Sequence, residues 1–156
     1  MRKLSTALLV AALTALLAAC GSGGPVKRLY PPQVSLQEMT VAADGKLALK
    51  LRLQNFSTVA MKFSRVDAYL RFGTTDAGKL GFDPAVTVGP GSVEVVEQSI
   101  ELDEAAQPLL AAALRERKAL RYQLKGNVAS SEPKADYDFE FESALNPVPG
   151  VDGVLR

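Results

Sequence analysis

Four leucines, at every second position from Leu47 to Leu53, constrain the fold of this chain more than any other feature. The residues between them include Lys50 and Arg52, so one side of the segment is apolar and the other is charged. A period of two is that of a β-strand, because successive side chains point to opposite faces of a sheet. The pattern predicts a strand that is half buried, with one face in water.

The same alternation recurs along the chain and predicts further antiparallel strands. A strand from Val34 to Val41 leads to Asp44-Gly45, a pair that favours a tight hairpin of type I′, in which both central residues need a positive φ. Later strands are expected at 63–72, 92–102, 120–128 and 137–141, with a brief one at 85–88.

Three stretches depart from regular alternation. Residues 73–81 are polar and glycine-rich, which indicates a turn region with room for a short edge strand at 79–81. The pattern slips after Val95, which predicts a β-bulge or a strand that passes from one sheet to another. Residues 146–156 are rich in Pro and Gly, and we expect an irregular tail there.

Residues 107–118 have helical periodicity. Pro108 suits the first turn of a helix, where its missing N–H costs nothing. One apolar stripe consists of Leu109, Leu110, Ala113 and Leu114, and basic residues fill the last turn. Six or seven short strands, hairpin links and one helix predict a mainly β chain: an antiparallel β-sandwich with one helical crossover, spanning residues 34–145.

The first twenty residues have the features of an export signal. Arg2 and Lys3 precede an apolar core of Leu, Ala and Val, which ends at Leu17-Ala18-Ala19-Cys20. This ending resembles the cleavage site of bacterial lipoproteins, with Cys20, the one cysteine of the chain, as the lipid-bearing first residue of the mature protein. The core is shorter than the about 20 apolar residues of a membrane-spanning helix. The alternatives are plain secretion after an Ala-x-Ala cut and an uncleaved anchor.

The lipoprotein resemblance divides the chain into a signal peptide at 1–19, a lipidated cysteine with a flexible tether at 20–33, and the domain. It implies diacylglycerol on the Cys20 sulfur and commonly a third acyl chain, such as palmitate, on its amine. Two or three chains hold a protein on a membrane stably, whereas one does not. Gly21, in place of Asp, implies the outer membrane facing the periplasm in a Gram-negative host.

Composition excludes several classes of function. The net charge of +1 gives no basic footprint for nucleic acid. The sequence has no histidine, which removes the commonest general base and the commonest metal ligand. It also has no glycine-rich phosphate loop at the start of a helix. We therefore expect no catalytic residues, no metal and no cofactor.

Clusters of charge have two interpretations each. Asp136, Asp138, Glu140 and Glu142 offer oxygens to a hard cation, but side chains at alternate strand positions fan along a flat face, so we favour a solvated face. The group Arg115, Arg117, Lys118 and Arg121 suits anionic lipid, although cations at a helix C-terminus also complement its dipole, which we favour.

Three smaller features remain. Lys27 and Arg28, in the tether, either contact head groups or only solubilise the linker, and we favour the latter. Asn55-Phe56-Ser57 matches the N-glycosylation triplet, which we take as coincidence. The aromatic residues Tyr122, Tyr137, Phe139 and Phe141 are expected to fill the core rather than line a pocket.

The order of these segments resembles the type 2 late-embryogenesis-abundant (LEA) family, whose module is also called the water-stress and hypersensitive-response domain. The segments that carry the resemblance are Val34-Ser35-Leu36, residues 47–55, residues 63–70, Gly89-Pro90-Gly91 and residues 122–126. One departure is Asn55-Phe56, where the family commonly has Asn-Pro. The resemblance implies an Ig-like or fibronectin-like β-sandwich of about seven strands with one helix, a link to desiccation stress, and no known catalytic residues.

Three hypotheses of function follow. The first is a non-enzymatic envelope lipoprotein that protects against water stress. The second is a binding or accessory subunit of an envelope assembly or transport machine, which takes a protein partner on an exposed strand edge. The third is a carrier of lipid or another small ligand, which requires a cavity between the sheets.

Overall fold

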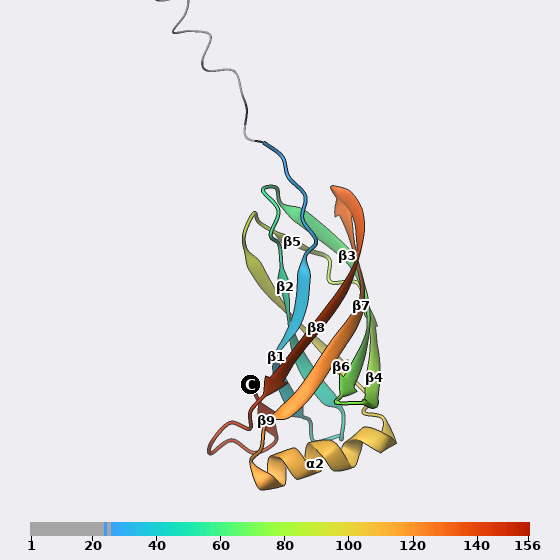
Figure 1. The fold of residues 1–156 in the computed structure, drawn as a ribbon, viewed down its shortest axis with the longest axis vertical. Helices are drawn as coiled ribbons and strands as arrows, with labels where there is room; N and C mark the ends of the chain where they lie inside the picture. The colour runs from blue at the N-terminus through green and yellow to red at the C-terminus, as the bar shows by residue number, and fades with distance from the viewer. Residues whose placement is uncertain (1–23, 25) are drawn as a thin grey trace, which may run out of the picture.

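Two antiparallel sheets lie face to face in the computed structural model, which describes residue 24 and residues 26–156 (Figure 1). The first sheet has the strand order β6-β2-β1-β9. Its strands are β1 (Gln33–Val41), β2 (Leu47–Gln54), β6 (Val93–Ile100) and β9 (Val154–Leu155). The prediction of a mainly β sandwich with one α-helix is confirmed.

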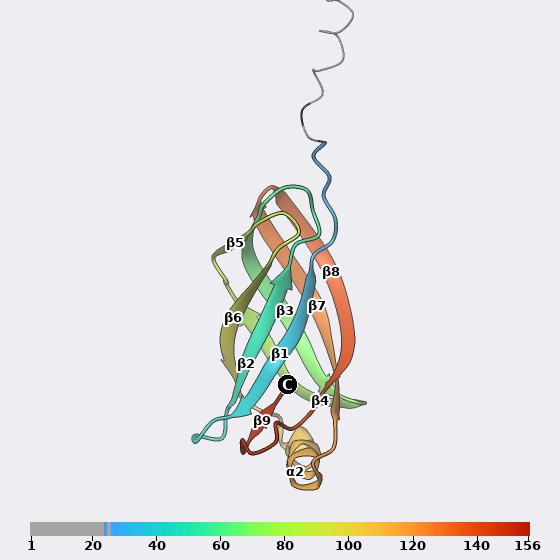
Figure 2. The same cartoon turned by 90° about the vertical axis from the view of Figure 1, so that its left-hand side faces the viewer.

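The second sheet has the order β4-β3-β7-β8, and β5 pairs with β3. Its strands are β3 (Met61–Phe72), β4 (Thr75–Phe82), β5 (Val86–Val88), β7 (Leu120–Glu132) and β8 (Lys134–Leu145). A view rotated by 90° shows β6, β2 and β1 in front, with β3 and β7 of the second sheet behind them (Figure 2). A 3₁₀ turn, η1 (Glu104–Ala106), and helix α2 (Gln107–Glu116) connect the first sheet to the second.

The core lies between the inner faces of the two sheets. The leucines of β2 are at most 1% exposed, and they face apolar residues such as Phe63, Leu70 and Leu124 from the other layer. Burial of apolar surface contributes about 25 cal/mol per Å², so this alternate-residue pattern is the main source of stability. The leucine alternation therefore has the role that the sequence predicted.

A single tyrosine links the two layers by hydrogen bonds. The Tyr122 hydroxyl of β7 accepts the Leu36 N–H at 3.1 Å and donates to the Leu36 carbonyl oxygen at 3.3 Å. Leu36 lies beside a register shift of β1, between Leu36 and Glu38, where the ladder to β2 is interrupted. Burial raises the pKa of the Tyr122 phenol, so the hydroxyl stays protonated. The phenol thus satisfies both backbone groups of Leu36.

Two expectations about strands are wrong. Residues 75–82 form a full strand, β4, rather than a turn region with a short edge strand at 79–81, because they pair with β3 from Val66 to Phe72. Strand β6 pairs with β2 in unbroken register, so it has no bulge and stays in one sheet. Its pattern slips because it is an edge strand whose Val95 faces outward and is 43% exposed. The shifts of register occur instead in β1 and β3, and in the β3–β4 ladder.

The hairpin between β1 and β2 is confirmed, but its turn is not of type I′. Ala42 donates to the Lys46 carbonyl at 2.9 Å, and Gly45 donates to the Ala42 carbonyl at 3.0 Å. Gly45 has φ +81°, whereas Asp44 is not among the residues with positive φ. The loop therefore needs one left-handed residue, and glycine supplies it.

The tail at 146–156 is also more regular than expected. Val154 and Leu155 form β9, which pairs with Thr40 and Met39 of β1. Asn146 and Arg156 exchange backbone hydrogen bonds of 2.6 and 2.9 Å. Leu155 is fully buried, so its side chain packs this segment against the core.

Helix α2 covers the end of the sandwich opposite to the end where the tether leaves (Figures 1 and 2). Pro108 lies in its first turn, and Leu110 and Ala113 face the core, as expected. Leu109, which was expected on the same apolar stripe, is instead 40% exposed. The helix ends at Glu116, two residues before the predicted end, because Arg117 adopts the left-handed conformation. None of the described helices is long and apolar enough to cross a membrane.

Candidate functional site

The predicted lipid-attachment site lies outside the described residues. Leu17, Ala18, Ala19 and Cys20 all precede residue 24, so the structure does not place them. From Val26 onward the chain runs along the end of the sandwich and enters β1 at Gln33. This end is therefore the part of the folded domain that is closest along the chain to the predicted lipid anchor.

The last part of the expected flexible tether is fixed to the loop between β2 and β3. The Thr58 hydroxyl accepts the Arg28 N–H at 2.8 Å and donates to the Val26 carbonyl at 2.8 Å. The Thr58 N–H donates to the Arg28 carbonyl at 3.0 Å. Ser57 bonds both backbone groups of Tyr30, at 2.9 and 3.2 Å. Residues 26–30 are thus part of the folded domain rather than free linker.

The Asn55 side chain holds that loop in place. Its amide group donates to the carbonyls of Val59, Val88 and Gly89 at 2.8, 3.0 and 3.1 Å, and its carbonyl oxygen accepts the Ser57 N–H at 2.8 Å. Asn55 is fully buried, so the glycosylation triplet is not accessible in the folded protein. Sequence reasoning missed this role; the signal was the asparagine that the chain shares with the Asn-Pro motif of the LEA type 2 family.

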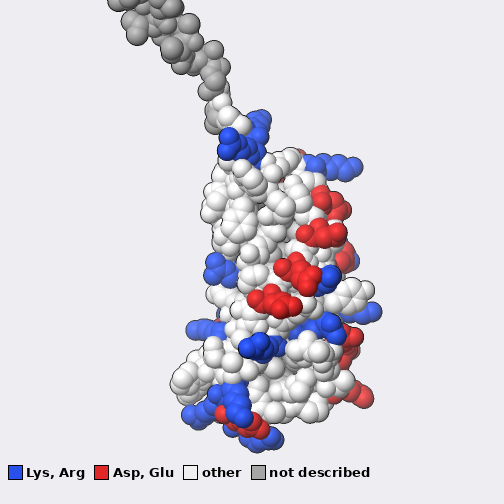
Figure 3. All heavy atoms as spheres, in the orientation of Figure 1, with Lys and Arg blue, Asp and Glu red and all other residues white. Residues whose placement is uncertain are grey.

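A surface of mixed apolar and basic character surrounds the exit of the tether. We call it the tether-end surface and define it by Val26, Lys27, Arg28, Leu29, Tyr30 and Phe56. Its four apolar members are 66%, 44%, 43% and 46% exposed, for Val26, Leu29, Tyr30 and Phe56 respectively. Figure 3 shows Lys and Arg side chains gathered where the tether leaves. The arrangement resembles that of residues at a membrane–water interface.

The acidic residues of β8 form a ladder on the outer face of the second sheet. Lys125 contacts Glu140 at 2.9 Å, and Glu140 raises the pKa of Lys125. The amide of Gln123 donates to Glu140 and Glu142 at 2.9 and 2.7 Å, and that of Asn127 donates to Asp136 and Asp138. In Figure 3 red side chains follow the course that β8 takes in Figure 1. Polar side chains of β7 thus provide hydrogen-bond and ion-pair partners for the carboxylates of β8, as the solvated-face interpretation predicts.

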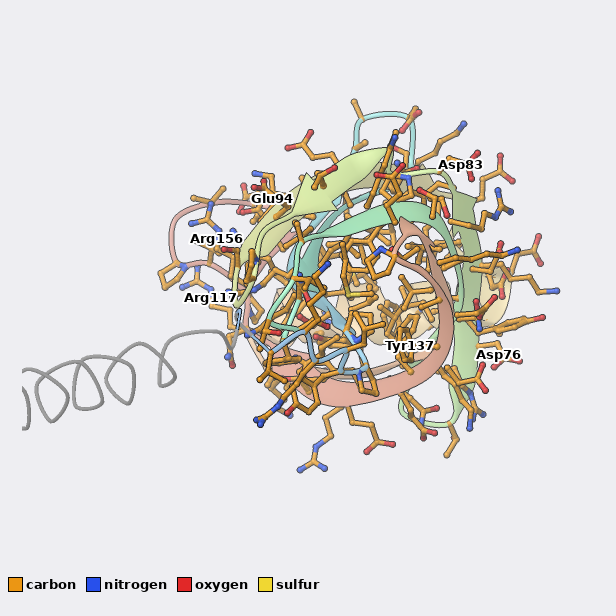
Figure 4. All side chains as sticks on the ribbon, turned by 90° about the horizontal axis from the view of Figure 1, so that it is seen from above. Asp76, Asp83, Glu94, Arg117, Tyr137 and Arg156 are labelled. Atoms are coloured by element: carbon orange, nitrogen blue, oxygen red, sulfur yellow. The ribbon has the colours of Figure 1, made fainter. Side chains whose placement is uncertain are left out.

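These carboxylates do not converge. In the part of the chain that the structure describes, no three His, Cys, Asp or Glu side chains are grouped as a metal site requires. Asp76 and Asp83, which are labelled in Figure 4, also stand on the outside of the strands, whereas Tyr137 lies toward the interior. The acidic residues of β8, together with Asp76 and Asp83, act as surface charge.

The basic group near the helix lies far from the tether. Arg115 and Lys118 both contact Glu116, at 3.3 and 2.9 Å, and Lys118 contributes most to the lowered pKa of that carboxyl. Arg117, at the helix C-cap, is labelled in Figure 4. Since α2 covers the opposite end of the sandwich, these cations face away from the predicted anchor, which favours the helix-dipole interpretation.

Several hollows on the described surface are open to solvent. One lies over the outer face of the second sheet, between Tyr69 and Lys125, with Gly126 in its floor. Gly126 is required there by close approach of strands, since a Cβ at this position would lie 2.0 Å from the Asp67 carbonyl oxygen. Tyr69 is covered on one side by Lys79, whose ammonium lies 5.2 Å from the ring centre. This hollow is not a gap between the sheets, where a carrier would hold its ligand.

Comparison with known proteins identifies the fold but not a family. No family model matches the sequence, and no curated protein matches it. The solution structure of AT1g01470 from Arabidopsis thaliana has a TM-score of 0.52 at 10% sequence identity, over 86% of this chain and 93% of that one. The identity is too low to indicate more than a shared fold.

Two further structures are less similar. A crystal structure of a protein from Archaeoglobus fulgidus has a TM-score of 0.40 at 13% identity, over 78% of this chain and 98% of that one. The solution structure of a candidate late embryogenesis abundant protein, At2g46140.1, has a TM-score of 0.40 at 14% identity, over 93% of this chain and 87% of that one. Similarities of this size support no inference. The comparisons thus establish that this chain has the β-sandwich fold of AT1g01470.

Proposed function

We propose that this protein is a non-enzymatic envelope lipoprotein of the LEA type 2 kind, which protects the envelope during desiccation or other water stress. The acyl chains on Cys20 hold it at a membrane, which in a Gram-negative host is the outer membrane, facing the periplasm. Its sandwich surface acts by contact and not by chemistry. The partner that this implies is the lipid membrane itself, with neither nucleic acid nor a cofactor.

One observation carries the proposal: a lipoprotein-like cleavage site lies directly before a folded domain whose order of strands resembles the LEA type 2 family. The lone cysteine stands at the position that lipidation requires, six residues before Val26. The sandwich fold agrees with that family's expected architecture. The described polar groups, such as the β8 ladder, are solvated and paired, which suits a protein that acts through its surface.

The test is deletion of the gene followed by drying or osmotic shock. We expect survival to fall and to recover with the wild-type gene, but not with a Cys20→Ala gene, whose product lacks the acylated sulfur. Unchanged survival of the deletion strain under both stresses would contradict the protective role.

An accessory role in an envelope assembly is a second candidate, and the edge strand β6 favours it. The outer edge of β6 is free of a partner strand in the described sheet, and Val95 on this strand is exposed. Such an edge accepts an added strand from another chain. Cross-linking in intact membranes tests this candidate. Capture of a defined partner protein through β6 supports it. If this protein forms no cross-link to another protein, the candidate is excluded.

A further inference from the structure

The tether-end surface is the place where exposed apolar groups gather on this molecule. Eight large hydrophobic side chains are exposed in the described chain, and four of them, Val26, Leu29, Tyr30 and Phe56, belong to this surface. Exposed apolar groups that gather in one place indicate a site of contact, whereas scattered ones do not. The other four lie apart from it, on β3, β6, α2 and the C-terminal tail.

The charge around these groups is mainly basic. Lys27 and Arg28 are exposed within the surface itself. Lys62 and Lys134, also exposed, begin β3 and β8 close by, and Glu132 opposes Lys62 across the β3–β7 ladder. Basic and apolar groups together suit an anionic bilayer, in which cations meet head groups and apolar side chains enter the interface.

Chain length keeps this surface close to the predicted anchor. The six residues from Cys20 to Val26 span at most about 21 Å when fully extended. Hydrogen bonds from Ser57 and Thr58 then fix residues 26–30 to the domain, so the tether cannot lengthen without breaking them. The end that bears the exposed apolar groups is therefore the end held nearest to the lipid.

We propose that the tether-end surface docks on the phospholipid bilayer in which the protein is anchored. This inference rests on the lipid anchor of the proposed function. Tyr30 and Phe56 enter the interface, and Lys27 and Arg28 contact anionic head groups. Docking orients the sandwich so that its long axis points away from the membrane. Helix α2 and the outer faces of the sheets then face the aqueous compartment. Phe56 stands where the resembling family commonly has proline, so this aromatic contact is a feature of this chain.

The absence of tryptophan from the sequence allows a direct experiment. The lipidated protein with Phe56→Trp is reconstituted in vesicles of phosphatidylethanolamine and phosphatidylglycerol with brominated acyl chains, which quench nearby indole. We expect a blue-shifted emission and at least about a twofold loss of intensity, since interfacial side chains enter about 5–10 Å below the head groups. The matched control is Tyr69→Trp, because Tyr69 is 57% exposed on the outer sheet face; its emission should stay unquenched.

The outcomes separate docking from anchoring. In one outcome the protein floats with the vesicles, but the indole is unquenched both in Phe56→Trp and in Tyr69→Trp. This result overturns docking and leaves the anchor intact. Protein that stays in solution overturns the anchor, and docking with it. Blue-shifted but unquenched emission at position 56 assigns the surface to a protein contact and also overturns docking.

A further variant tests how much the basic side chains contribute to docking. Replacing Lys27 and Arg28 by Glu in the Phe56→Trp protein should weaken quenching on anionic vesicles. It should not alter the midpoint of urea unfolding, because both side chains are exposed. Quenching that is equally strong in this variant contradicts the proposed head-group contacts.

Discussion

Asn55 is the residue on which the tether end of the sandwich depends. The Asn55 side chain forms hydrogen bonds with three backbone carbonyls and one backbone N–H from two loops. Asn55 is fully buried. Removal of a buried donor leaves those acceptors without partners, which costs more than the net gain of the bonds themselves. The residue therefore has a structural role that determines how the surface beside it is held.

We expect Asn55→Ala to lower the free energy of unfolding by about 2–3 kcal/mol, because buried acceptors lose their donor. Urea unfolding of the variant and of the wild-type protein measures this loss of free energy. Asn127→Ala is the control, because its amide bonds Asp136 and Asp138 on the outer sheet face, and its effect should stay within about 0.5 kcal/mol. Equal effects of the two substitutions would show that Asn55 does not organise the loops.

Tyr122 has a comparable role between the layers. Tyr122→Phe keeps the ring but removes the hydroxyl that bonds both backbone groups of Leu36. We expect a loss of about 1–2 kcal/mol in the free energy of unfolding. Tyr137→Phe, on the partly buried face of β8, is the control, since among the described residues its hydroxyl makes no hydrogen bond. A Tyr122→Phe protein as stable as wild type would contradict the bridging role.

At the scale of elements, the C-terminal strand β9 is held to β1 by charge as well as by its ladder. Glu38 is buried on the outer side of β1, contacts Lys50 at 2.9 Å and also accepts from the Arg156 guanidinium. These partners, Lys50 first, hold the pKa of Glu38 below its ordinary value of 4.5. The carboxylate joins β2, β1 and the chain end.

The stability that Glu38 provides depends on pH in a defined direction. Because its pKa is lower in the folded state, its contribution is present above pH 4.5 and is lost as pH falls through the folded pKa. Glu38→Gln should therefore be less stable than wild type by about 1 kcal/mol at neutral pH, with faster amide exchange at Val154 and Leu155. The difference should vanish in acid. A difference of constant size from pH 7 to pH 2 would rule out this linkage.

Strands were predictable from the sequence wherever their two faces differ in polarity. The leucines of β2 and the alternating aromatics of β8 identify their strands because one face is buried and the other is wet. Strand β4 was predicted only as a short edge strand at 79–81, because glycines at 78 and 81 remove side chains from the pattern. Strand β9 was missed because it depends on pairing with β1, more than 110 residues earlier in the chain, as Met39 opposite Leu155 shows.

The candidate site was only partly predictable, for the same physical reason. Local sequence indicates the lipid-attachment motif and the solvated ladder of β8. It does not indicate that Thr58 and Ser57 fix residues 26–30, because those contacts join segments about 30 residues apart. Exposure of Phe56 likewise follows only from the folded loop.

On the scale of the whole molecule, the two ends of the sandwich differ. One end carries the tether and the tether-end surface, and the other carries α2 with cations that are partly paired to Glu116 (Figures 1 and 3). The sheet faces between them bear paired charges. A protein built in this way presents its sides and its helical end when one end is held at a lipid surface.

The most direct test of the account is the mass of the mature protein extracted from membranes. Intact-protein mass spectrometry should find a chain that begins at Cys20 and carries the added mass of a diacylglyceryl group, with or without a third acyl chain. A chain that retains residues 1–19, or one whose Cys20 is a bare thiol, would contradict the central claim that this sandwich works while fastened to a membrane.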